Sequence, residues 1–272
     1  MENLFKFQLF LFCFLSISIS VKSQDTTTVY FNKKWKITKK EKAQYIQEEI
    51  KLDSNRYVIR KMTVNRRPVS ICHYKSINPT IEHGIVNYFD ENGKIAISGS
   101  YNEGYMDGLW YIYNQSKSTY DTLNYHGVKE IYLGEYDDYS YESSEIFFIV
   151  EEMPRFGYSG KSGKEEFREY IAQNLHYPIR ALENQVEGRV FIQFVVGADG
   201  RVIMPKAVVK ADRDLTFEAI RVIKDSPQWV PGKQRNMPIS VQFTFPIVFV
   251  LIIRAKYPLR CWVRIVYCLV FR

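Results

Sequence analysis

The chain of 272 residues is long enough for one large domain or two small ones, and its 46% hydrophobic and 25% charged residues are typical of folded proteins. Its formal net charge is +7, of which residues 253–272 supply +5 and residues 1–23 supply +1. The body of the chain is therefore nearly neutral, which excludes the basic surface that a nucleic-acid-binding protein needs.

The N-terminus has the features of an export signal. Lys6 precedes an apolar run, residues 7–21, and the small residue Ser23 suits cleavage before Gln24. A membrane-spanning helix needs about 20 apolar residues, so a cleaved signal peptide (residues 1–23) is favoured over a short uncleaved anchor. Cys13 lies inside the run rather than after it, which argues against a lipid anchor.

Residues 24–82 are expected to form a β-rich lead-in. β-branched and aromatic residues at 57–59 and 62–64 predict short strands. The charged stretch 39–51 has its apolar residues on one side and predicts a short helix. Cys72 is expected to be a small buried residue.

An internal repeat marks residues 83–145. Residues 84–90 align with residues 108–114 at an offset of 24, each with a glycine, an aromatic and β-branched run, and a polar turn. Asn92-Gly93 between them is a strong hairpin signal. Residues 102–110 resemble the MORN repeat, a β-hairpin unit with paired glycines and aromatics. The resemblance implies a short antiparallel array that presents a surface and does no chemistry.

Residues 146–252 are expected to form a third unit, which starts with a strand in the apolar run 146–150. The capping box formed by Ser162 and Glu165 then predicts a helix that runs to Asn174. Pro178 suits the first position of a second short helix.

Three further strands are predicted in this unit, at residues 190–196, 201–210 and 239–249. A helix capped by Asp214 and stopped by Pro227 separates the last two. The order of helix, hairpin, helix and strand predicts an α+β fold, an antiparallel sheet with helices on one face.

Dispersed residues between positions 150 and 249 resemble one family, the TonB C-terminal domain. The first block is Tyr177-Pro178, Ala181, Glu187-Gly188-Arg189-Val190, Phe194-Val195-Val196 and Asp199-Gly200. The second block is Ala219-Ile220, Pro227, Trp229, Pro231-Gly232-Lys233, Pro238, Phe245-Pro246-Ile247 and Phe249. Motif residues expected to be structural are Tyr177, Pro178, Gly188, Gly200, Pro227, Trp229, Pro231 and Gly232, with Trp229 in the core.

The resemblance implies a protein that binds an extended segment of an outer-membrane receptor by β-augmentation, in energy-coupled transmembrane transport. It implies a location in the periplasm, or in the inner membrane facing the periplasm. Implied partners are TonB-dependent receptors and an inner-membrane proton-driven motor complex; a homodimer is left open. The implied peptide-binding edge is the last strand, at Ile239, Ser240, Val241, Gln242, Phe243, Thr244 and Phe245.

Two departures from TonB transducers support an alternative. Such proteins have a true membrane anchor and a proline-rich spacer, whereas only Pro68 and Pro79 precede Pro154 here. The alternative is a periplasmic protein-interaction module without energy coupling. The basic, apolar tail at 253–272 is foreign to the family, and an altered reading frame, a poorly ordered extension or a basic segment lying on a membrane surface would account for it.

No catalytic constellation is present, so no enzyme activity, cofactor or metal is expected. Gly160-Lys161-Ser162 resembles the end of a P-loop, but the position of its first glycine holds Arg155. The four histidines have no ligand spacing, and Cys72, Cys261 and Cys268 form no CxxC motif.

Overall fold

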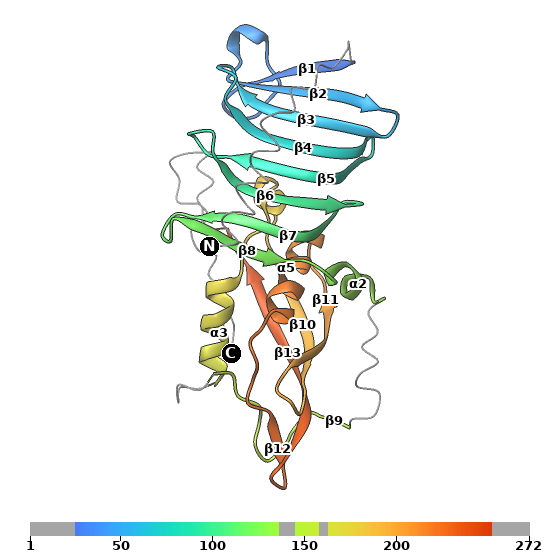
Figure 1. Ribbon diagram of the computed structural model, residues 1–272, viewed down its shortest axis with the longest axis vertical. Helices are drawn as coiled ribbons and strands as arrows, with labels where there is room; N and C mark the ends of the chain where they lie inside the picture. The colour runs from blue at the N-terminus through green and yellow to red at the C-terminus, as the bar shows by residue number, and fades with distance from the viewer. Residues whose placement is uncertain (1–24, 136–144, 158–162, 252–272) are drawn as a thin grey trace, which may run out of the picture.

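The computed structural model describes residues 25–135, 145–157 and 163–251, which form two β-sheets stacked along the long axis of the molecule (Figure 1). The predicted signal segment, the residues at 160–162 and the basic tail lie outside these ranges. Within them, no helix has the length and hydrophobicity needed to cross a membrane.

The first sheet is an antiparallel meander in which each of eight strands pairs with the next one in sequence. Its strands are β1 (Thr26–Phe31), β2 (Tyr45–Asp53), β3 (Arg56–Thr63), β4 (Pro68–Ile77), β5 (Thr80–Phe89), β6 (Ile95–Asn102), β7 (Tyr105–Asn114) and β8 (Thr119–Asn124). The predicted lead-in and the predicted repeat region therefore form one continuous sheet.

The short helix predicted at residues 39–51 is wrong. Only Lys40–Lys42 forms a turn of 3-10 helix, and the rest of the stretch enters β2. β2 pairs with β1 on one side and with β3 on the other, and its Ile46 is buried. Pairing along two edges outweighs the weak helical pattern of the charged residues.

The two halves of the internal repeat lie in β5 and β7. The predicted turn between β5 and β6 is present, with Gly93 at a φ of 78°. In β6, a Cβ atom at Gly99 would lie 2.1 Å from the ring of Trp110, so the glycine allows the indole to lie flat on the neighbouring strand. A MORN-like identity for this region stays a prediction.

The second sheet has the strand order β11-β10-β13-β12, with β9 paired to β13. Its strands are β9 (Ile146–Phe147), β10 (Gly188–Val196), β11 (Val202–Val209), β12 (Gly232–Gln234) and β13 (Met237–Phe249). The helices are α2 (Val128–Leu133), α3 (Gly163–Asn174), α4 (Ile179–Glu183) and α5 (Arg213–Lys224). The unit is α+β as predicted, but β9 runs parallel to β13, so the sheet is not wholly antiparallel.

Asp212, not Asp214, caps α5. The side chain of Asp212 accepts hydrogen bonds from the backbone N–H groups of Asp214 and Leu215. The carboxylate of Asp214 instead pairs with Arg180. Either aspartate suits the start of this helix by type, and the charge partner on α4 decides between them.

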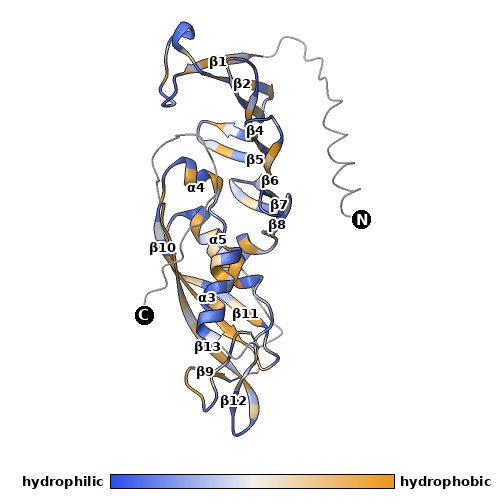
Figure 2. Ribbon diagram, turned by 90° about the vertical axis from the view of Figure 1, so that its left-hand side faces the viewer, coloured by the Kyte–Doolittle hydropathy of each residue, from blue (hydrophilic) through white to orange (hydrophobic). Residues whose placement is uncertain are grey.

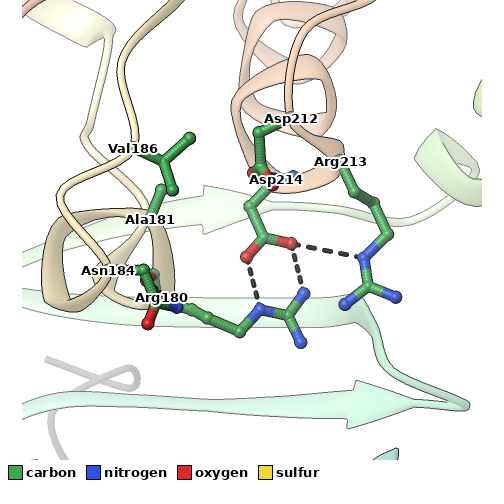
Figure 3. A pocket seen from close by; sticks show the side chains of 7 residues that line it. All are labelled: Arg180, Ala181, Asn184, Val186, Asp212, Arg213 and Asp214. Atoms are coloured by element: carbon green, nitrogen blue, oxygen red, sulfur yellow. Dashed lines mark hydrogen bonds and ion pairs between the residues drawn. The ribbon is translucent and has the colours of Figure 1, made fainter.

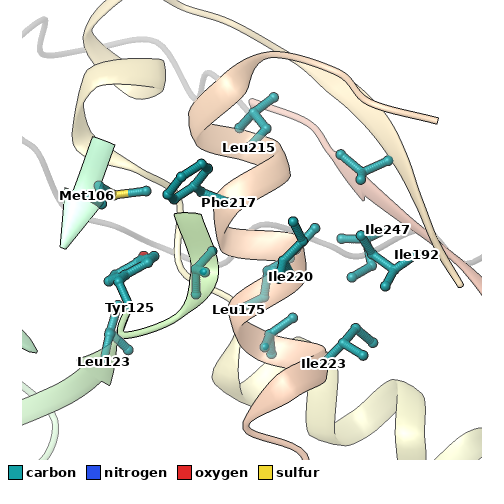
Figure 4. Packing of buried hydrophobic residues seen from close by; sticks show 14 of the residues in the cluster. Met106, Leu123, Tyr125, Leu175, Ile192, Leu215, Phe217, Ile220, Ile223 and Ile247 are labelled. Carbon is teal, nitrogen blue, oxygen red and sulfur yellow. The ribbon is translucent and has the colours of Figure 1, made fainter. Parts of the chain in front are cut away.

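Helix α5 lies between the two sheets and joins them into one core (Figures 1 and 2). Figure 4 shows Met106, Leu123 and Tyr125 of the first unit on one side of α5, with Ile192 and Ile247 of the second sheet on the other. The C-terminal unit is thus attached to the first sheet by buried apolar packing.

Candidate functional site

One edge of β13 is the candidate site. Along residues 241–249, β13 pairs with β10, from Val196 opposite Val241 to Gly188 opposite Phe249. The described residues place no strand on the other side of positions 242–249. Pro246, which has no N–H to donate, is compatible with a strand that has one free edge.

Alternate side chains of β13 anchor this edge in the core. Val241, Phe245, Ile247 and Phe249 are buried, whereas Thr244 is exposed. The ring of Phe245 packs against Phe167 of α3 with centroids 4.8 Å apart. The backbone of the edge is therefore held rigidly before any partner arrives, which lowers the entropy cost of adding a strand.

The structure divides the seven predicted edge residues into two groups. Ile239 pairs with Gly232 of β12, and Ser240 and Val241 pair with β9. Gln242, Phe243, Thr244 and Phe245 pair with β10 alone among the described strands. The open stretch of the edge also continues beyond the predicted range, to Phe249.

The predicted motif residues Trp229 and Gly200 support the sheet from one end. Trp229 is buried, with its ring centroid 4.7 Å from that of Phe167, and its Nε1–H donates to the Ser226 hydroxyl over 2.9 Å. Gly200 has a φ of 81°, and a Cβ atom there would lie 2.0 Å from the carbonyl oxygen of Trp229. The turn between β10 and β11 thus fits directly against the loop that leads to β12.

The other motif glycines also permit close approach. A Cβ atom at Gly188 would lie 2.8 Å from the Cβ of Ala211, and one at Gly232 would lie 2.8 Å from the side chain of Val241. Pro227 and Pro231 flank Trp229 in the loop between α5 and β12.

Tyr177 and Pro178 lead into α4. The Tyr177 ring packs edge-on against Phe249 at the end of β13, with centroids 5.7 Å apart, and its hydroxyl donates to the Val186 carbonyl. Burial raises the pKa of Tyr177 to about 12. Pro178 is the residue before α4 rather than its first residue.

A buried charged network joins the two units, and sequence reasoning missed it. Glu218 of α5 is 0% exposed; it accepts hydrogen bonds from the Tyr125 hydroxyl over 2.6 Å, from the His176 backbone N–H over 2.7 Å and from Arg221 over 2.7 Å. Burial by itself lowers the pKa of Arg221, but Glu218 outweighs it and the net direction is upward. Burial, and then Glu218, raises the pKa of Tyr125.

A second ion-pair cluster lies at the same boundary (Figure 3). Arg180 pairs with Asp214 and, over 2.9 Å, with Glu82 of β5, and its guanidinium lies 4.9 Å from the ring centroid of Tyr101. Arg180 and Asp214 also line an open pocket of about 340 Å³ beside Arg213. The charges of the acidic and basic side chains in this pocket compensate each other. The cluster is therefore better suited to attaching the two units than to binding a ligand.

Across the described ranges, no group of three or more His, Cys, Asp or Glu side chains is placed to hold a metal ion.

Residues 173–251 match the family model of the Gram-negative bacterial TonB protein C-terminal domain. The match runs from the end of α3 through β13 and includes the whole candidate edge, which supports the resemblance drawn from the sequence. It covers neither the eight-stranded sheet nor β9. No curated protein and no solved structure matched the chain.

Proposed function

We propose that this protein binds an extended segment of an outer-membrane receptor by adding it as a strand to the free edge of β13, in energy-coupled transport across the envelope. The observation that carries the proposal is the edge of residues 242–249 opposite β10, which no described strand covers and which lies within the residues matched by the family model. The proposed role is binding rather than catalysis. The proposed location of the protein is the periplasm or the periplasmic face of the inner membrane.

The free stretch is long enough for specific recognition. Eight residues of strand span roughly 27 Å at about 3.4 Å per residue. Backbone groups provide most of the affinity in β-augmentation, and pockets beside alternate side chains provide the specificity.

The distinctive test is backbone methylation of the bound segment. Synthetic peptides that copy the periplasm-facing segments of outer-membrane receptors are titrated against the whole chain by fluorescence anisotropy. A strand on an edge uses every second N–H group, so N-methylation of one alternating set of residues abolishes binding. Methylation of the other set serves as the matched control and leaves most of the affinity. Equal effects of both sets would mean that the peptide does not bind as a strand.

Energy coupling is tested separately, through the N-terminus. Residues 1–23 are replaced by another cleaved export signal, and receptor-dependent uptake is measured. Loss of uptake is expected if the native N-terminus connects the protein to a proton-driven motor. Fractionation with N-terminal sequencing accompanies the test: Met1 in the inner membrane supports coupling, whereas Gln24 in the periplasm argues against it.

Unchanged uptake would favour the second candidate, a periplasmic interaction module without energy coupling. One observation supports that alternative. The eight-stranded sheet is attached to the C-terminal unit by the buried Tyr125–Glu218 hydrogen bond and the Arg180–Glu82 ion pair rather than by an extended spacer. The sheet then provides a second docking surface.

A further inference from the structure

The edge proposed for the receptor segment is already partly occupied by this chain. Phe147 of β9 pairs with Val241, and Val241 also pairs with Val196 of β10. A strand residue has only two edges, so β9 lies on the side opposite β10. Ile146 pairs with Ser240 next to it. A segment that covers the start of this edge therefore meets β9.

The attachment of β9 is short. Its two residues make a small number of backbone hydrogen bonds, and Ile146 is 37% exposed. The neighbouring Ser240 is buried, and its hydroxyl has no hydrogen-bond partner within the described ranges. A buried polar group without a partner costs free energy, and β9 pairs with the residue that carries it.

The chain after β9 is held firmly to the hairpin of β12 and β13. Glu152 and Lys233 exchange two backbone hydrogen bonds of 3.1 and 2.8 Å. The Glu151 carboxylate accepts a hydrogen bond from the Arg235 backbone N–H over 2.9 Å. Release of β9 thus leaves its C-terminal attachment intact, and β9 stays at high effective concentration beside the edge.

Between β9 and this attachment, two apolar side chains are unusually exposed: Phe148 by 66% and Ile149 by 87%. The chain bends at Phe148 and Ile149 and then turns toward β12, so the pairing of β9 with β13 ends at Phe147. β9 therefore covers the edge at Ser240 and Val241 only, and residues 242–249 stay open among the described strands.

We propose that β9 is a built-in competitor, a strand of this chain that covers the start of the edge and is displaced by the receptor segment. This inference rests on the proposed function. Occupation by β9 shields part of an exposed strand edge from unwanted pairing. It also means that only segments that bind better than β9 gain the whole edge, because their binding must compensate for its release.

The test uses Phe147→Pro, which removes an N–H group from β9 and disfavours the pairing. Ile149→Pro is the matched control, since residue 149 has no strand partner in the described structure. Two probes are titrated by anisotropy: a receptor-segment peptide, and a peptide that copies residues 145–150 between solubilising lysines. We expect Phe147→Pro to bind both probes about tenfold more tightly than wild type, the effect of losing one or two backbone hydrogen bonds. The control should match wild type.

The outcomes separate the two proposals. Equal affinity of wild type and Phe147→Pro for the receptor peptide overturns the competitor and leaves receptor binding intact. Failure of the receptor peptide to bind either protein, with tighter binding of the β9 copy to Phe147→Pro, overturns receptor binding and leaves the competitor. Circular dichroism checks the fold, and the double variant Ile146→Gly/Phe147→Gly replaces Phe147→Pro if the latter is misfolded.

Discussion

The two sheets of this protein bury their residues in different ways. In the eight-stranded sheet each strand pairs with its sequence neighbour, and β1, farthest from the C-terminal unit, has no buried residue. In the C-terminal unit, ten of the twelve residues of α5 are buried, because a sheet lies on either side of the helix. Stability is therefore expected to be concentrated where the units meet and to decrease toward β1.

The largest expected effect comes from breaking the contact at α5. Glu218→Ala removes the closest charge partner of the buried Arg221, which keeps only Asp225 at 3.3 Å, and should lower the free energy of unfolding by about 3–5 kcal/mol. Chemical denaturation measures the loss. Glu103→Ala is the matched control, because the pair of Glu103 with Lys75 is exposed on the first sheet. A denaturation midpoint that moves equally in both variants would contradict the comparison.

A smaller effect is expected from two glycines in hairpin turns, one in each sheet. Gly93 and Gly200 both have positive φ, so alanine at either position introduces about 1 kcal/mol of backbone strain. Only at Gly200 does the new Cβ meet an obstacle, the Trp229 carbonyl at 2.0 Å; at Gly93 nothing lies within 4 Å. Gly200→Ala should therefore cost about 2–4 kcal/mol in total. Equal losses in thermal denaturation would show that the turn at Gly200 relaxes freely.

The smallest expected effect depends on pH and tests how well the middle of the first sheet is buried. Burial raises the pKa of the Cys72 thiol to about 11 from 9.0. The folded protein favours the neutral thiol. The contribution of this thiol to the free energy of unfolding is therefore complete below pH 9 and is lost as the pH rises toward 11.

The measurement compares wild type with Cys72→Ala. The difference between their free energies of unfolding should shrink by about 1 kcal/mol between pH 8 and pH 10. A thiol reagent should label Cys72 only after unfolding, with Cys13, Cys261 and Cys268 replaced by serine. Rapid labelling of the native protein at pH 8 would show that this part of the sheet is open.

Much of the C-terminal unit could be predicted from sequence because its signals are local. Apolar and polar residues alternate along β10 and β13, and β10 ends at the turn that contains Gly200. The α+β class followed from the order of these elements. For the same reason the stretch at 39–51 was misjudged: its strand pairs with β1 and β3, and a local pattern does not contain those partners.

The candidate site could be predicted only in part. The family resemblance pointed to β13, but the division of its edge between β9 and free backbone depends on a pairing across about 94 residues of sequence. The buried positions of Asp214 and Glu218, and the half-buried position of Arg180, were also missed, since such side chains are usually exposed unless paired. The spacing of Glu218 and Arg221 in α5 is visible in the sequence, but the contacts of Glu218 with Tyr125 and of Arg180 with Glu82 join elements that no spacing rule connects.

The nearest-neighbour pairing of the first sheet has a consequence for how the chain folds. Each hairpin closes a short loop, so the sheet can assemble one strand at a time as the polypeptide emerges. The contact of Tyr125 with Glu218, in contrast, closes a loop of 93 residues. Folding should therefore proceed from the N-terminus and finish late, when α5 arrives and β13 adds beside β10. Until then the edge that we propose for binding does not exist, so a partly synthesised chain is expected to bind no receptor segment.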